Sequence, residues 1–74
     1  MLVVPVKLLK KAKYSPKDCE VLNSRDINKI RLVSEKYYDY WEEVHSMNPK
    51  LTSGLSASKE IYSLVMQEYE RVYT

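Results

Sequence analysis

The residues whose type and spacing most clearly suggest a chemistry are five lysines close together at the start of the chain. They are Lys7, Lys10, Lys11, Lys13 and Lys17, and residues 1–17 contain no Asp or Glu, so this segment carries a charge of +5. Residues 18–74 carry seven Lys or Arg against ten Asp or Glu, a charge of −3, which gives the net charge of +2. A basic segment beside a mildly acidic body is typical of a protein that contacts nucleic acid or another anionic surface. A lysine-rich segment also keeps an apolar N-terminus soluble, and both interpretations stay open.

Two further arrangements could do chemistry, and each has a simpler explanation. Glu42 and His45 lie three residues apart on one face of a predicted helix, a spacing that metal-binding helical bundles use. A single pair of this kind is more often a solvated surface, so we expect no metal site and no cofactor. Cys19 has no histidine on its segment and is expected to be a small buried hydrophobic residue. No phosphate-binding Gly-rich loop or paired catalytic carboxylates can be assembled, and we expect that the protein is not an enzyme.

Four aromatic residues are concentrated near the middle of the chain, and they are Tyr37, Tyr38, Tyr40 and Trp41. Because the sequence contains no Phe, we expect tyrosine to take its place in the core, and we favour core packing for this group. A tyrosine-rich face also suits protein binding, because each ring combines a rigid apolar area with a polar tip. Stacking of nucleic-acid bases on these rings is a third interpretation.

The length of 74 residues indicates one small domain, residues 1–74, with a basic N-terminal arm over 1–17 and a helical body over 18–74. Chains of this size bury only about 60% of their unfolded surface and often gain stability from disulfides, a metal or a partner subunit. A single cysteine excludes an intramolecular disulfide, so we expect a homodimer. The free cysteine and the lack of a long apolar run or a signal sequence predict a cytoplasmic (intracellular) protein with no membrane partner.

The elements that must position these residues are predicted to be mainly α-helical after a short N-terminal extended segment. Leu2–Leu8 is apolar and β-branched, which favours an extended strand, and Leu8–Lys13 is alternatively the start of a short helix. Ser15 is expected to cap a short helix that follows it. Apolar residues spaced three and four apart predict a long helix over about 25–47, and a second helix is predicted over about 57–73. The two long helices would form a helical hairpin.

The second predicted helix carries apolar residues over more than half of its circumference, which one neighbouring helix cannot cover. A helix of this kind is usually buried centrally, often across a dimer interface. The residues expected to form that interface are Ile61, Tyr62, Val65, Met66 and Tyr69.

The segment Gly54–Met66 resembles the turn and second helix of the ribbon-helix-helix family of Arc/Mnt-like DNA-binding repressors. Gly54, Ser56 and Ser58 match the Gly-x-Ser/Thr/Asn-x-Ser/Thr/Asn turn that this family places between its two helices. The positions that follow also match the family, and they are Glu60, Ile61, Tyr62, Val65 and Met66. The resemblance implies an intertwined homodimer with a two-stranded ribbon. It also implies that the amides near Ser56, Ser58 and Lys59 hold the DNA backbone at a helix start.

Two functions of different classes remain. The first is a small dimeric DNA-binding protein, a transcriptional repressor or an accessory factor, that contacts double-stranded DNA. Its predicted backbone-binding residues are the five lysines of the arm together with Ser56, Ser58 and Lys59, and we expect phosphate contact rather than base-specific readout. The alternative is a helical protein–protein interaction module, a small inhibitor or adaptor of the kind that viruses and plasmids encode, with no DNA binding.

Overall fold

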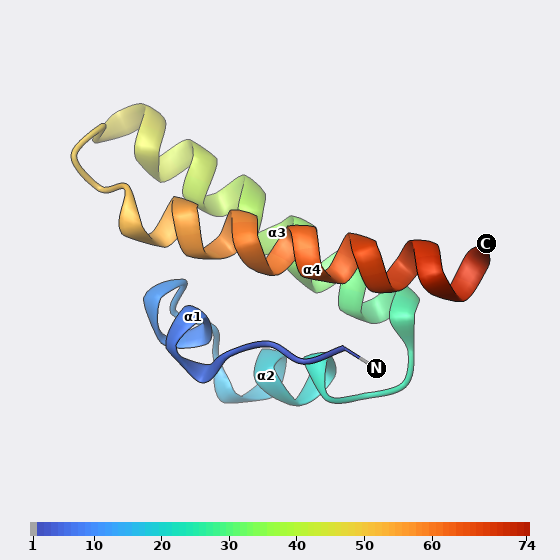
Figure 1. Ribbon diagram of the computed structural model, residues 1–74. Coiled ribbons are helices and arrows are strands. Elements are labelled where there is room, and N and C mark those ends of the chain that lie inside the picture. Colours follow the sequence, from blue (N-terminus) through green and yellow to red (C-terminus); the bar gives the residue numbers. More distant parts are fainter. Residues whose placement is uncertain (1) are drawn as a thin grey trace.

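The structure, a computed structural model, describes residues 2–74 and contains four α-helices joined by short loops (Figure 1). In chain order these are α1 (Val6–Lys11), α2 (Pro16–Leu22), α3 (Ile27–Met47) and α4 (Ser53–Tyr73). No strand occurs within residues 2–74. The predicted helical character is therefore confirmed.

Capping side chains explain where α2 and α3 begin. The Oγ atom of Ser15 accepts a hydrogen bond from the N–H of Asp18 at 3.2 Å, as the sequence predicts. Asp26 caps α3 in the same way, accepting from the N–H of Asn28 at 3.1 Å and of the next residue at 3.3 Å. Each cap satisfies amides that have no partner within the first turn of the helix. The long helix predicted over 25–47 is observed as α3, two residues shorter at its start.

The two long helices form an antiparallel hairpin, and the two short helices cover one side of it (Figure 1). α1 packs against α4, and α2 packs against α3. The core lies between these layers, and its buried apolar residues are Leu8, Ala12, Tyr14, Leu22, Ile27, Ile30, Ala57, Ile61 and Val65. All four helices therefore contribute to one core.

The ribbon-helix-helix fold implied by the family resemblance is wrong, because that fold requires a β-ribbon and residues 2–74 contain no strand. The extended strand favoured for Leu2–Leu8 is not observed, because α1 begins within this segment, at Val6, two residues before the alternative helix start at Leu8. Helix formation places Leu8 and Ala12 one turn apart on the same face, where both are buried. Two lysines occupy the last turn of α1, where positive charge is favourable at the negative end of the helix. Burial against α4 thus outweighs the β-propensity of the local sequence.

The second long helix begins at Ser53, four residues earlier than the predicted start at residue 57. Gly54 therefore lies inside the first turn of α4 with an ordinary negative φ, and not in a left-handed turn. A Cβ atom at position 54 would lie only 2.5 Å from Cε3 of Trp41 on α3. Glycine is needed here because the two helices approach each other closely at this point.

Two of the five residues predicted to form a dimer interface are buried within a single chain. Ile61 and Val65 are both 0% exposed, because α1 and α3 cover the apolar surface of α4 from two directions. Tyr62, Met66 and Tyr69 are only half-buried. One of the two reasons for expecting a dimer is that a single neighbouring helix cannot cover α4, and two helices do so here. The homodimer therefore stays a prediction without structural support.

Candidate nucleic-acid interface

The lysines of the N-terminal segment are held on a folded support. Lys7, Lys10 and Lys11 follow a three- and four-residue spacing along α1 and so share one helical face. The other face of α1 carries Leu8 and Ala12, which are buried against the core. All five lysines of residues 1–17 are exposed, and none of them forms an ion pair with an acidic residue of the described chain. Their charge is therefore available to a ligand.

The backbone at Lys13 has a left-handed conformation with a φ of 57°. It ends α1 in a Schellman motif, in which the N–H of Lys13 donates to the carbonyl of Lys10 at 3.2 Å and the N–H of Tyr14 to that of Leu9 at 3.0 Å. Glycine is the preferred residue at this position, because a Cβ atom is disfavoured in the left-handed region. A lysine here stores local backbone strain, which is a feature that clusters at functional sites.

The side chain of Lys13 lines a pocket of about 360 Å³ between the end of α1 and the middle of α3. The lining residues, which we call the lysine–tyrosine pocket, are Ala12, Lys13, Lys36, Tyr37, Tyr40 and Trp41. None of them is acidic. Folding thus brings Lys36, from the acidic body of the chain, to the same pocket as a lysine of the N-terminal segment. We define the basic surface as Lys7, Lys10, Lys11, Lys13, Lys17 and Lys36.

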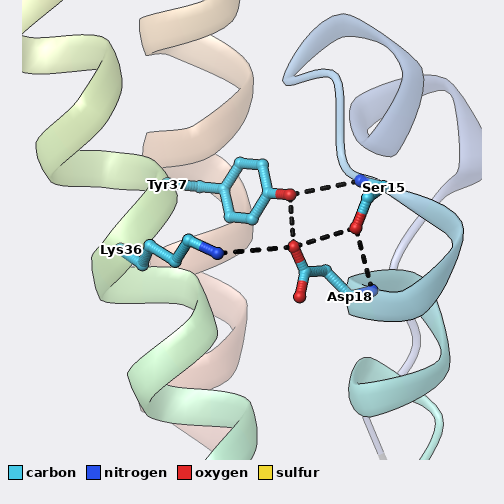
Figure 2. Close-up of polar contacts among 4 residues, drawn as sticks. All are labelled: Ser15, Asp18, Lys36 and Tyr37. Carbon is cyan, nitrogen blue, oxygen red and sulfur yellow. Dashed lines mark hydrogen bonds and ion pairs between the residues drawn. The ribbon is translucent and has the colours of Figure 1, made fainter.

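A hydrogen-bonded cluster beside this pocket joins α2 to α3 (Figure 2). The Oδ2 atom of Asp18 accepts hydrogen bonds from the hydroxyl of Tyr37 and from the Oγ of Ser15, the latter at 3.0 Å. The Nζ of Lys36 lies 3.8 Å from the same carboxylate oxygen. The hydroxyl of Tyr37 in turn accepts from the N–H of Ser15 at 3.2 Å. These contacts fix two of the side chains that line the pocket.

The pKa values of two side chains at this cluster are shifted, for different reasons. The hydrogen bond from Tyr37 is the main cause that holds the pKa of Asp18 below its ordinary value; Ser15 and Lys36 add to it, and partial burial opposes it. Tyr14 stacks on Tyr37, with ring centroids 3.8 Å apart and an angle of 13° between the rings. Burial is the main cause that raises the pKa of Tyr14, and its hydroxyl has no hydrogen-bond partner in the described structure. The two stacked rings therefore serve packing.

The aromatic residues near the middle of the chain have different roles. Trp41 is 8% exposed, and its indole N–H donates to the carbonyl of Ala12 at 2.9 Å, which joins the end of α1 to α3. Tyr38 packs edge-on against Tyr62 of α4, with ring centroids 5.3 Å apart. Tyr40 is 57% exposed and lines the lysine–tyrosine pocket. The prediction that these aromatic residues pack in the core is therefore correct for Trp41 and wrong for Tyr40.

The helix start that was predicted to hold phosphate has a different geometry. The N–H of Ser56 donates to the carbonyl of Thr52 at 2.9 Å, inside a helix that begins at Ser53. Ser58 is 0% exposed, and its Oγ donates to a backbone carbonyl of the preceding turn at 3.0 Å. The prediction of free amides at these serines is therefore wrong, because α4 begins one turn earlier. Lys59 is exposed on α4 and lines a different pocket from that of Lys13.

Lys36 is the residue of this surface that sequence reasoning missed. It lies four residues before Tyr40, which places the two on one face of α3. That spacing indicates a cationic and aromatic face, but it gives no sign that Lys13 lies beside it. Only the packing of the end of α1 against α3 brings the two lysines together.

Other types of site are not found within residues 2–74. In that range no group of three or more His, Cys, Asp and Glu side chains could hold a metal ion. No helix of the described chain combines the length and the hydropathy that crossing a bilayer requires. No protein-family model, curated protein or solved structure matches this chain.

Proposed function

We propose that this protein binds nucleic acid through its basic surface and acts as a small accessory DNA-binding factor. The observation that carries the proposal is that all five lysines of the N-terminal segment remain exposed, and none of them forms an ion pair within 4.0 Å of an acidic group of the described chain. Lys36 extends this set from α3. Most of these lysines are attached to helices that pack into the core, which gives their charges a rigid support.

The chemistry of this surface suits phosphate groups. Lysine is a flexible point charge, and each lysine that neutralises a phosphate releases counterions from the nucleic acid. Such contacts carry no sequence information. The helices that bear most of these lysines are short, with six residues in α1 and seven in α2, and no strand is present within residues 2–74. We therefore propose binding to the DNA backbone rather than base-specific repression.

A titration of fluorescently labelled duplex DNA tests the proposal, with the dissociation constant measured at several salt concentrations. Contact with about four phosphates gives a slope of about −4 in a plot of log K against log salt concentration. The affinity should then fall by about two orders of magnitude between about 50 and 200 mM salt. Failure to bind duplex DNA at the lowest salt concentration would rule the proposal out.

A pair of charge-matched variants locates the binding surface. Lys10→Gln combined with Lys11→Gln removes two charges from the exposed face of α1. Lys29→Gln combined with Lys50→Gln removes two charges from exposed positions near opposite ends of α3. We expect the first variant to lose about tenfold in affinity at low salt and the second to bind nearly as the wild type does. An equal loss in both would indicate a dependence on net charge alone.

One observation favours a protein partner as a second candidate function. Tyr38 and Tyr62 lie half-buried on the α3–α4 hairpin, where a pocket of about 370 Å³ also carries Glu35, Asp39 and Glu42. A face that combines tyrosines with carboxylates is complementary to a basic protein surface. A pull-down in the presence of nuclease distinguishes the two functions. A partner retained after nuclease treatment and lost in the Tyr62→Ala variant would favour the protein-binding alternative.

A further inference from the structure

The lysine–tyrosine pocket differs from the rest of the basic surface because it is hollow and aromatic. Lysines that contact only the duplex backbone need no cavity, since phosphates lie on the outside of the helix. The volume of about 360 Å³ falls at the lower end of the range of about 300–1,000 Å³ for small-molecule sites. The pocket is therefore large enough for one small chemical group of a ligand.

The walls of the pocket define the chemistry of that ligand part. Trp41 and Tyr37 are held by hydrogen bonds, to Ala12 and to Asp18 respectively, so their rings have fixed positions. Tyr40 is 57% exposed and lies edge-on to Trp41, with ring centroids 5.2 Å apart. An exposed ring beside a rigid aromatic wall offers a stacking surface for a flat, aromatic group.

The charges at the pocket indicate that the ligand is an anion. Lys13 and Lys36 both line it, and both are exposed. Asp18, outside the pocket, lies 3.8 Å from Lys36 and partly neutralises it, whereas Lys13 has no acidic partner in the described chain. Lys13 also occupies the left-handed position at which glycine would be less strained, so the sequence keeps a cationic side chain there against the backbone preference.

The geometry points to an unpaired nucleobase of a single strand as the occupant of the lysine–tyrosine pocket, with the neighbouring phosphates on Lys13 and Lys36. This inference rests on the proposed function and makes it more specific, because it predicts that the protein prefers single-stranded to double-stranded nucleic acid. In a duplex the bases are stacked and cannot reach a pocket on a protein surface. Stacking on an aromatic ring does not depend on the identity of the base, so the preference is for strandedness and not for sequence.

The single tryptophan of the chain, Trp41, lines the pocket and gives a direct optical signal. The experiment compares oligothymidylate with a duplex that has the same number of phosphates, and follows both Trp41 emission and the affinity of labelled ligand. We expect oligothymidylate to change the emission of Trp41 and to bind about five- to tenfold more tightly than the duplex, as stacking of one base predicts. Thymidine monophosphate is the third ligand, and it should bind much more weakly because it lacks the neighbouring phosphates.

Two tyrosines of equal exposure provide the matched variants. Tyr40→Ala, at 57% exposure, should reduce the affinity for oligothymidylate to that for the duplex and leave duplex binding unchanged. Tyr73→Ala, at 58% exposure on the end of α4, should change neither affinity. Far-UV circular dichroism establishes that both variants are folded, and Lys13→Gln gives a second variant of the pocket that should also lose the preference.

The outcomes separate this inference from the proposed function. Equal affinity for duplex and oligothymidylate, with unchanged Trp41 emission, would overturn the inference and leave phosphate binding intact. Absence of binding to either polymer would overturn both. Thymidine monophosphate that binds as tightly as oligothymidylate would also overturn the inference, because the occupant would then be a free nucleotide.

Discussion

At the scale of single residues, the carboxylate of Asp18 is the point at which α2 and α3 are joined (Figure 2). One of its oxygens accepts hydrogen bonds from Tyr37 on α3 and from Ser15 at the start of α2. The Asp18 side chain is 18% exposed, so water screens these contacts only in part. The same contacts hold the wall of the lysine–tyrosine pocket, which links local stability to the proposed binding site.

Tyr37→Phe should lower the free energy of unfolding by about 1–2 kcal/mol near neutral pH, because it removes a hydroxyl that donates to Asp18 and accepts from Ser15. The effect should depend on pH. The lowered pKa of Asp18 stabilises the folded state at pH values above the ordinary pKa of about 3.9, and that contribution is lost as the pH falls through the lower folded-state pKa. The difference between variant and wild type should therefore shrink in acid.

Urea unfolding of both proteins, from neutral pH down to about pH 3, measures this difference. Tyr40→Phe, at an exposed tyrosine of the same helix, is the control and should follow the wild type at every pH. A difference between Tyr37→Phe and wild type that stays constant over the whole pH range would contradict the role assigned to Asp18.

Lys13→Gly should have opposite effects on stability and on binding. Relief of the left-handed strain at a φ of 57° should raise the free energy of unfolding by about 1 kcal/mol, while loss of the side chain weakens nucleic-acid binding. Lys11→Gly, two residues earlier and inside α1, should instead destabilise the protein by about 0.5–1 kcal/mol. Thermal unfolding of the two variants checks the opposite signs. A Lys13→Gly variant less stable than the wild type would contradict the claim that the backbone is strained at this position.

At the scale of the elements, the close approach of α3 and α4 depends on one glycine. Gly54→Ala should destabilise the protein by about 1–3 kcal/mol, because the added methyl group would lie 2.5 Å from the ring of Trp41. Alanine is favoured over glycine by about 1 kcal/mol inside a helix, so propensity alone predicts the opposite sign. Ser56→Ala, at an exposed position of the same turn, is the control and should be neutral or slightly stabilising. Chemical denaturation, monitored by Trp41 fluorescence, measures the free energy of unfolding of both variants. A Gly54→Ala variant more stable than the wild type would contradict the close packing of α3 on α4.

The docking of α1 on α4 can be tested in the same way. Leu8→Ala should destabilise the protein by about 2–4 kcal/mol, because Leu8 is only 7% exposed and packs in the core. Val6→Ala, at 64% exposure in the same helix, should change stability by less than about 0.5 kcal/mol. The free energy of unfolding of a protein of this size is about 4–11 kcal/mol, so the loss caused by Leu8→Ala is a large share of the total stability. Equal stability of the two variants would show that the lysine-bearing segment is not docked.

The elements that the sequence predicted correctly are those with local signals. Ser15 caps α2 as expected, and the three- and four-residue periodicity locates α3. The error at α1 has a tertiary cause, since Leu8 is buried where α1 packs on α4. At the start of α4, the close approach of Trp41 that requires Gly54 is likewise a tertiary feature that the sequence does not reveal. The candidate site likewise has one part that the sequence predicts and one part that depends on tertiary packing. The five lysines follow from composition, whereas the pocket depends on the packing of the end of α1 against α3 and could not be predicted.

At the scale of the whole molecule, which measures 37 × 24 × 16 Å, two pockets of different charge lie along α3. Lys36 and Tyr40 line the lysine–tyrosine pocket, whereas Glu35, Asp39 and Glu42 line a pocket on a neighbouring face of the helix. A polyanion that approaches the basic surface therefore does not meet these three carboxylates on the same face. This separation favours a defined orientation of the bound strand.

The most direct test of the central claim is a map of amide chemical-shift changes in the ¹⁵N-labelled protein as a nucleic-acid strand is added. The account predicts that the largest changes occur at the end of α1 and in the middle of α3, around Lys10, Lys11, Lys13 and Lys36, and that they decrease as salt is raised. Residues of the acidic side of α3, such as Asp39 and Glu42, should not respond. Changes confined to α4 or to the acidic side of α3, or no changes at low salt, would contradict the account.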